Sequence, residues 1–171
     1  MYVAPLPEER FKVNVGTTEP SSIEDLRRLY PGHGDGRGYL REPPSFHLDA
    51  SLERVRPVTG EIECVIKRFG GYETIVHKDI ARAWAAENRC RYPFSWERDA
   101  FFKAHPEIPG QVERILDLGS ILDIPRTDIP GHADHHVCVR ELGGHRGVRI
   151  FTSCDTEESS GIYSFLFIAQ P

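Results

Sequence analysis

The sequence predicts an α+β fold, in which an antiparallel sheet carries three or four helices mainly on one of its sides. Three observations support this fold class: two double-glycine turn signals between alternating segments, a strongly apolar segment at residues 161–169, and a central region with helix caps and helical apolar spacing. Strands are therefore expected near both ends of the chain, with helices between them. The regular alternation of strands and helices that is typical of a parallel sheet is not visible.

The C-terminal part of the chain predicts a β-hairpin that turns at Gly143-Gly144. The segments 136–142 and 145–151 alternate between apolar and polar residues, and two glycines suit a two-residue turn with positive φ. Such a turn sets a cross-strand register with these pairs: Val139 with Val148, Val137 with Ile150, and Glu141 with Arg146. The segment 161–169 is apolar on both faces and is expected to lie inside the sheet next to this hairpin.

A second hairpin is predicted around Gly70-Gly71, between residues 61–69 and 72–77. The same turn geometry gives the pairs Ile66 with Ile75, Val65 with Val76, and Arg68 with Glu73. It also places Cys64 opposite His77, so that a thiol and an imidazole would lie at cross-strand distance. This pair is a candidate nucleophile and base, although regular strands seldom carry nucleophiles.

Four segments carry helix signals: 21–29, 79–88, 96–105 and 109–118. The first three begin at the cap residues Ser21, Asp79 and Ser95, and the fourth is expected to stop at Gly119. In the second helix, the residues expected on the inner side are Ile80, Ala83 and Trp84.

The 171 residues fit a single domain, 1–171, which is long enough to bury a core without disulfides or metals. Within it, residues 1–20 form a proline-rich N-terminal arm, with a short edge strand expected at 11–15. Residues 31–45 form a loop rich in glycine and proline. A hydrophobic content of 39% and a charged content of 27% are typical of globular proteins.

The overall charge and the apolar segments limit the function classes. A net charge of −5 argues against general nucleic-acid binding, which needs a basic surface. The apolar segments fall short of the ~20 residues that span a bilayer, and the N-terminus lacks the pattern of a signal peptide, so a soluble cytoplasmic protein is expected. The four cysteines are widely spaced, which favours reduced thiols over a disulfide framework or a zinc ribbon: Cys64, Cys90, Cys138 and Cys154.

One face of the C-terminal hairpin is a candidate catalytic site. His136 and Cys138 share a face of their strand, and the predicted register places Arg149 opposite Cys138. His136 would act as the base, the Arg149 guanidinium would lower the pKa of the Cys138 thiol, and Arg140 would add a second cation for an anionic substrate. The alternative is that Cys138 is a small buried residue and that the two arginines are solvated.

The same segment is also a candidate metal site. His132 and His136, with His135 and Cys138 nearby, are ligand types for a divalent metal such as zinc. His136 lies in the predicted strand and His132 in the loop before it. The loop would therefore have to fold back so that both histidines reach the same ion. The alternative is an ordinary polar loop that enters a strand.

The sequence leaves three functions open, and it does not decide whether the protein is an enzyme. The first is an enzyme of hydrolase or lyase type that acts on a small anionic substrate at His136, Cys138 and Arg149. The second is a non-catalytic protein-binding or regulatory domain, with the N-terminal arm wrapped around the partner. The third is a metal-binding protein that uses His132 and His136.

Overall fold

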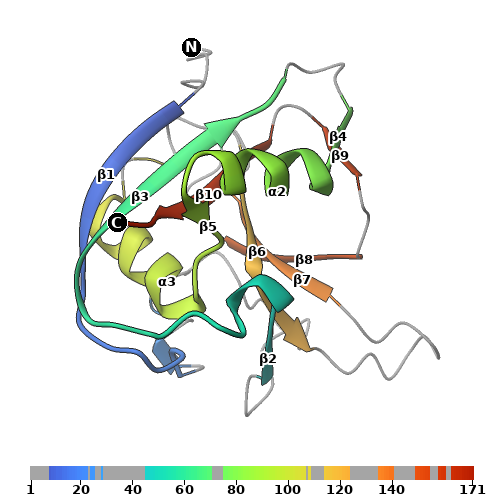
Figure 1. Ribbon diagram of the computed structural model, residues 1–171. Helices are drawn as coiled ribbons and strands as arrows, with labels where there is room; N and C mark the ends of the chain where they lie inside the picture. Colours follow the sequence, from blue (N-terminus) through green and yellow to red (C-terminus); the bar gives the residue numbers. More distant parts are fainter. Residues whose placement is uncertain are drawn as a thin grey trace, which may run out of the picture.

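The computed structural model describes residues 8–22, 24–25, 28, 45–70, 75–106, 108, 114–123, 135–140, 149–154, 158–160 and 163–171. The strands are β1 (Glu8–Val15), β2 (Ser45–Leu48), β3 (Gly60–Arg68), β4 (Ile75–His77), β5 (Cys90–Arg91), β6 (Arg114–Asp123), β7 (His135–Arg140), β8 (Arg149–Cys154), β9 (Glu158–Ser160) and β10 (Tyr163–Ala169). The helices are η1 (Ala50–Leu52, a 3-10 helix), α2 (Lys78–Glu87) and α3 (Ser95–Ala104). Their arrangement confirms an α+β fold (Figure 1).

An 8-stranded sheet organises the molecule, in the order β1-β3-β10-β6-β7-β8, with β2 paired to β6 and β5 paired to β10. The curved strands β1 and β3 run side by side at one end of this sheet (Figure 1). Strand β1 lies at the edge, which confirms the edge strand expected at residues 11–15. Strands β4 and β9 form a separate two-stranded sheet.

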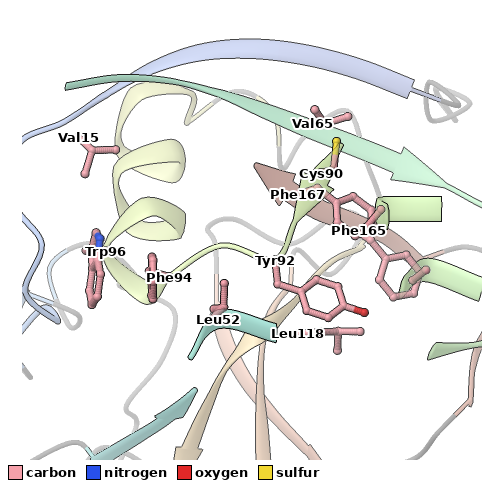
Figure 2. Close-up of a cluster of buried hydrophobic side chains, with 12 residues drawn as sticks. Val15, Leu52, Val65, Cys90, Tyr92, Phe94, Trp96, Leu118, Phe165 and Phe167 are labelled. Atoms are coloured by element: carbon pink, nitrogen blue, oxygen red, sulfur yellow. The ribbon is translucent and has the colours of Figure 1, made fainter. Parts of the chain in front are cut away.

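Strand β10 lies in the interior of the large sheet, as its apolar sequence predicts. It pairs antiparallel with β3 and β5 and parallel with β6. The sheet is therefore mixed rather than purely antiparallel. The residues from Phe165 to Ile168 are all buried, which is possible only because both faces of the strand are covered. Figure 2 shows Phe165 and Phe167 in the cluster of buried side chains that surrounds Tyr92.

The hairpin predicted at Gly70-Gly71 is wrong. Strand β3 lies between β1 and β10, and the Cα partners of Ile66 are Glu9 and Leu166 instead of Ile75. Strand β4 pairs with β9. The physical reason is that the consecutive residues Cys64, Val65 and Ile66 are buried. A strand with both faces buried belongs inside a sheet, and the 3-residue β4 is too short to cover its edge.

The C-terminal hairpin is confirmed as the antiparallel pair β7 and β8, but its predicted register is wrong. Val139 has Ile150 as its Cα partner instead of Val148, and Val137 has Thr152. On the other side of β7, Val139 pairs with Ile115 of β6. The observed register thus aligns three aliphatic residues across three strands, which favours it over the register of a two-residue turn. The turn itself, Gly143-Gly144, lies outside the described residues.

Two of the predicted helices are confirmed and one is wrong. The segments 79–88 and 96–105 correspond to α2 and α3, whereas residues 114–118 of the predicted segment 109–118 belong to strand β6. This strand is flanked by β10, β2 and β7, and these pairings override the local helical spacing. Near the N-terminus, residues 24, 25 and 28 have helical backbone conformation.

None of the three predicted caps holds: Asp79 lies inside α2, which begins at Lys78, and the other two caps are displaced by one residue. Ser22 rather than Ser21 accepts a hydrogen bond from the backbone N–H of Asp25, at 3.1 Å. Helix α3 begins at Ser95, and its cap is Phe94, whose N–H donates to the Glu97 carboxylate at 2.8 Å.

The inner side of α2 also differs from the prediction. Ala81 and Ala85 are buried, whereas Ile80 is 48% exposed and Ala83 is exposed. Only Trp84 lies on the inner side as expected, where its ring contacts Phe167. The helix therefore packs its small residues against the sheet. Among the described residues, no helix has the length and apolarity needed to span a membrane.

Helices α2 and α3 cover opposite faces of the sheet, which corrects the expectation that the helices lie mainly on one side. Phe11 of β1 is aligned through β3 with Ile168 of β10, so these two residues share a face. The neighbouring Phe167 points to the other face. The ring of Phe101 in α3 lies 5.6 Å from Phe11, and the ring of Trp84 in α2 lies 5.1 Å from Phe167.

Candidate functional site

The residues predicted to form a catalytic site lie on the confirmed hairpin. His136 and Cys138 belong to β7, and Arg149 begins β8. The Cα partner of Cys138 is Phe151, however, and Arg149 is the partner of Arg140. The structure therefore does not place Arg149 opposite Cys138, because the register is displaced by two residues from the predicted one.

The second candidate pair, Cys64 and His77, is not brought together. Cys64 lies in β3 and has Phe11 and Ile168 as its Cα partners, whereas His77 lies in β4 opposite Glu158. Cys64 is completely buried, and this burial raises the pKa of its thiol to about 12. A thiol with that pKa is protonated at neutral pH, so Cys64 is a core residue and not a nucleophile.

The predicted metal ligand His132 lies outside the described residues, while His136 lies in β7. The described part of the chain contains no group of three or more histidine, cysteine, aspartate or glutamate residues that could hold a metal ion. The metal site at His132 and His136 therefore stays a prediction.

A groove with a volume of about 540 Å³ lies where β3 and β10 separate. Its lining comes from the start of β3, the loop before it, the end of β10 and single residues of β1 and β5. The lining residues are Lys12, Val55, Arg56, Val58, Glu61, Ile62, Glu63, Arg91, Ile168, Ala169, Gln170 and Pro171.

The groove lies beyond the last pair that β10 makes with β3. Their pairing ends at Ile168 and Cys64. Beyond this point Ala169 pairs with Cys90 of β5, and the N–H of Gln170 donates to the carbonyl of Arg89 at 2.7 Å. The C-terminal residues thus follow β5, while β3 continues to its first residue, Gly60, with β1.

The groove opens along the edge of β3. Ile62 and Glu63 are neighbours in this strand, so their side chains point to opposite faces of the sheet, yet both line the groove. Gly60 begins the strand with φ of +112°, a conformation that favours glycine, and so lets the chain enter β3 at this end of the groove.

Ion pairs neutralise both acidic side chains of the groove. The Lys12 ammonium lies 3.3 Å from the Glu61 carboxylate, and the Arg10 guanidinium lies 2.9 Å from the Glu63 carboxylate. Within the described part of the chain, Arg56 has no ion-pair partner, and it is exposed. The groove therefore has an excess of positive charge at Arg56.

Arg91 forms a fixed wall of the groove. Its guanidinium donates two hydrogen bonds to the Glu97 carboxylate, at 2.8 and 2.7 Å, and one to the carbonyl of Tyr92 at 3.0 Å. It also lies 5.3 Å from the centre of the Phe94 ring. These contacts neutralise Arg91 and hold it in place, so Arg56 is the cation of the groove that is left for a ligand.

No signal in the amino-acid sequence predicts this groove. Val55, Arg56 and Val58 lie in a loop that carries no recognisable motif, and the groove depends on where β10 leaves β3. Val58 is 51% exposed, but this exposure is visible only in the folded chain.

Known proteins give no family for this chain. No family model, no curated protein and no solved structure matches it. The groove and the β7–β8 pair are therefore interpreted from their own geometry and charge.

Proposed function

We propose that the protein is a binding domain and that its groove takes an anionic ligand with an apolar body. A volume of about 540 Å³ lies within the range of ~300–1,000 Å³ that is typical of ligand sites. The apolar part of the lining would contact the body of the ligand: Val55, Val58, Ile62, Ile168 and Ala169. The observation that carries the proposal is the exposed Arg56 beside this apolar lining, in a groove whose acidic groups already have cationic partners.

Hexanoate is a suitable probe because it combines a carboxylate with a short apolar chain. We expect titration of the full chain to shift the backbone amide NMR signals of Val58 and Ile62. Arg56→Glu should weaken binding about two- to fivefold, the effect of losing one exposed ion pair. Arg54→Glu makes the same charge change at an exposed residue outside the lining and should leave binding unchanged. Binding that does not shift the groove signals, or that both variants weaken equally, would contradict the proposal.

A second candidate function is supported by the register of the C-terminal hairpin. Arg140 and Arg149 are Cα partners, and like charges directly opposite each other destabilise an antiparallel pair. Two cationic residues in register would favour an anion bound at this position. We propose this as the anchor of a small anionic substrate, with His136 as the base and Cys138 as the thiol of an enzyme.

Inorganic phosphate tests the second candidate. If an anion binds at this position, phosphate should raise the melting temperature of the protein, and Arg149→Gln should remove most of the increase. The control is Arg54→Gln, which should respond to phosphate as the unmodified protein does. A phosphate effect that is the same in all three proteins would exclude an anion site at Arg149.

A further inference from the structure

We propose that the ligand of the groove is an extended peptide segment that adds to the edge of β3 along Gly60–Glu63. This inference rests on the proposed function and specifies its ligand. Strand addition of this kind uses main-chain hydrogen bonds for affinity and side-chain contacts for specificity.

The first four residues of β3 have a strand on only one side in the described structure. Strand β1 pairs with β3 from Gly60 to Lys67, whereas the pairing of β10 covers only Cys64 to Arg68. Within a strand, alternate residues turn their N–H and C=O groups to opposite edges. Every second residue of Gly60–Glu63 therefore turns its main-chain groups toward the groove.

In the described structure the C-terminal residues 169–171 make no pair with this edge, and their recorded backbone partners lie in and next to β5. Ala169 is the Cα partner of Cys90, and the Gln170 N–H donates to the Arg89 carbonyl. They form the opposite wall of the groove, where Gln170 and Pro171 belong to the lining. An added strand would lie between two walls that are already fixed.

The shape of the groove favours an extended ligand over a compact one. Four residues of a strand span roughly 13 Å, so a peptide of four to six residues would cover Gly60–Glu63. Residues from both faces of the sheet line the groove, as Ile62 and Glu63 show. The side chains of a strand also alternate between two faces, and a peptide would therefore match the lining on both sides.

The lining also indicates the sequence of the peptide. Apolar peptide side chains would pack against Val58, Ile62 and Ile168, and an acidic side chain would pair with Arg56. We therefore expect peptides in which aliphatic and acidic residues alternate. A basic peptide residue would meet the excess positive charge at Arg56 and bind more weakly.

A display library of random hexapeptides, selected against the full chain, tests this inference. We expect enrichment of alternating aliphatic and acidic sequences that shift the amide signals of residues 60–63. Methylation of alternate peptide nitrogens keeps the side chains but removes the donors along one edge. The methyl groups can be placed at either the odd or the even peptide positions. One of these two patterns removes the N–H donors that face β3, and that pattern should reduce binding at least tenfold.

Two variants with matched changes locate the binding surface. Val58→Asp places a negative charge in the groove and should reduce peptide binding several-fold. Ile80→Asp makes the same type of change on α2 at a residue of similar exposure, 48% against 51%, and should have no effect. Equal effects of the two variants would overturn the proposed location.

The outcomes also separate this inference from the proposed function. Two results would show that the peptide inference is wrong while the proposed function stands. In the first, hexanoate binds at the groove but no peptide is enriched; in the second, methylation at neither the odd nor the even peptide positions changes binding. If neither hexanoate nor any peptide binds there, both are wrong. If peptides bind and shift only signals outside residues 55–63, the strand-addition site is wrong.

Discussion

The guanidinium of Arg98 donates a hydrogen bond to the carboxylate of Asp117 at 3.0 Å, although both side chains are almost completely buried. This bond joins α3 to β6. A second bond of Arg98, at 3.1 Å, goes to Asp99, whose other carboxylate oxygen accepts from the Ser21 hydroxyl at 2.7 Å. Asp117 also accepts from the N–H of Gly119 at 2.7 Å. One buried cation thus lies between two buried carboxylates.

Replacing Arg98 with methionine should strongly destabilise the fold. Methionine keeps the apolar stem but removes the buried cation that is paired with Asp117, and loss of one partner of a buried ion pair costs on the order of 3–5 kcal/mol. Urea unfolding measures this loss. The control Arg10→Met breaks the exposed pair with Glu63 and should cost less than about 1 kcal/mol. Similar losses in the two variants would contradict the prediction.

Asp117 should make stability depend on pH. Burial raises the pKa of its carboxyl from 3.8 to about 7, against the opposing effect of Arg98. Between about pH 4 and pH 7 the folded protein therefore binds a proton that the unfolded chain releases, and the free energy of unfolding falls as the pH rises, by up to ~1.4 kcal/mol per pH unit. The contribution of Asp117 to the free energy of unfolding is fully present below about pH 4 and is lost above about pH 7.

The variant Asp117→Asn isolates this contribution, because asparagine has no proton to release. Unfolding of both proteins in urea between pH 4.5 and 8 should show that the stability advantage of the aspartate form shrinks as the pH rises. Parallel pH profiles of the two proteins would show that Asp117 does not titrate in this range.

Gly119→Ala should destabilise the protein. Gly119 lies inside β6, and a Cβ atom there would overlap the backbone carbonyl of Pro93. Backbone cannot rotate away as a side chain can, so a loss of about 1–3 kcal/mol or more is expected. Gly16→Ala is the matched control, because nothing lies within 4 Å of its added Cβ atom. Thermal unfolding of the two variants measures the difference.

Cys64 should resist alkylation in the folded protein. Its thiol is buried and its pKa is raised to about 12, so neither access nor ionisation favours reaction. Iodoacetamide treatment at pH 8, followed by mass spectrometry of peptides, should find Cys64 unmodified in buffer and modified in urea. Rapid labelling in buffer would mean that the β3 region opens readily.

The sequence predicted those elements whose signals are local. The both-sided apolar pattern of 161–169 identified β10, the alternation of 11–15 identified the edge strand, and caps with helical spacing identified α2 and α3. Prediction failed for segments whose secondary structure is decided by the strands they pair with. The segment 109–118 has helical spacing, but residues 114–118 belong to β6, where Ile115 and Leu116 pair with β10 on one side and β7 on the other.

Charges were the least predictable feature. Three consecutive charged residues such as Glu97-Arg98-Asp99 usually point to solvent. All three are buried here because each has a polar partner: Arg91 for Glu97, Asp117 for Arg98 and Ser21 for Asp99. The groove was missed as well. It depends on the separation of two strands that are distant in the sequence, and no local pattern records where that separation occurs.

The position of β10 has a consequence for how the protein is made. This strand joins β3 to β6 in the sheet, but in the chain it comes after both of them and after all the other strands of the described residues. A nascent chain on the ribosome therefore cannot complete the sheet until residues 163–169 have emerged. Until then the apolar edge of β3 is exposed to other chains, and binding by a chaperone at that stage would limit aggregation.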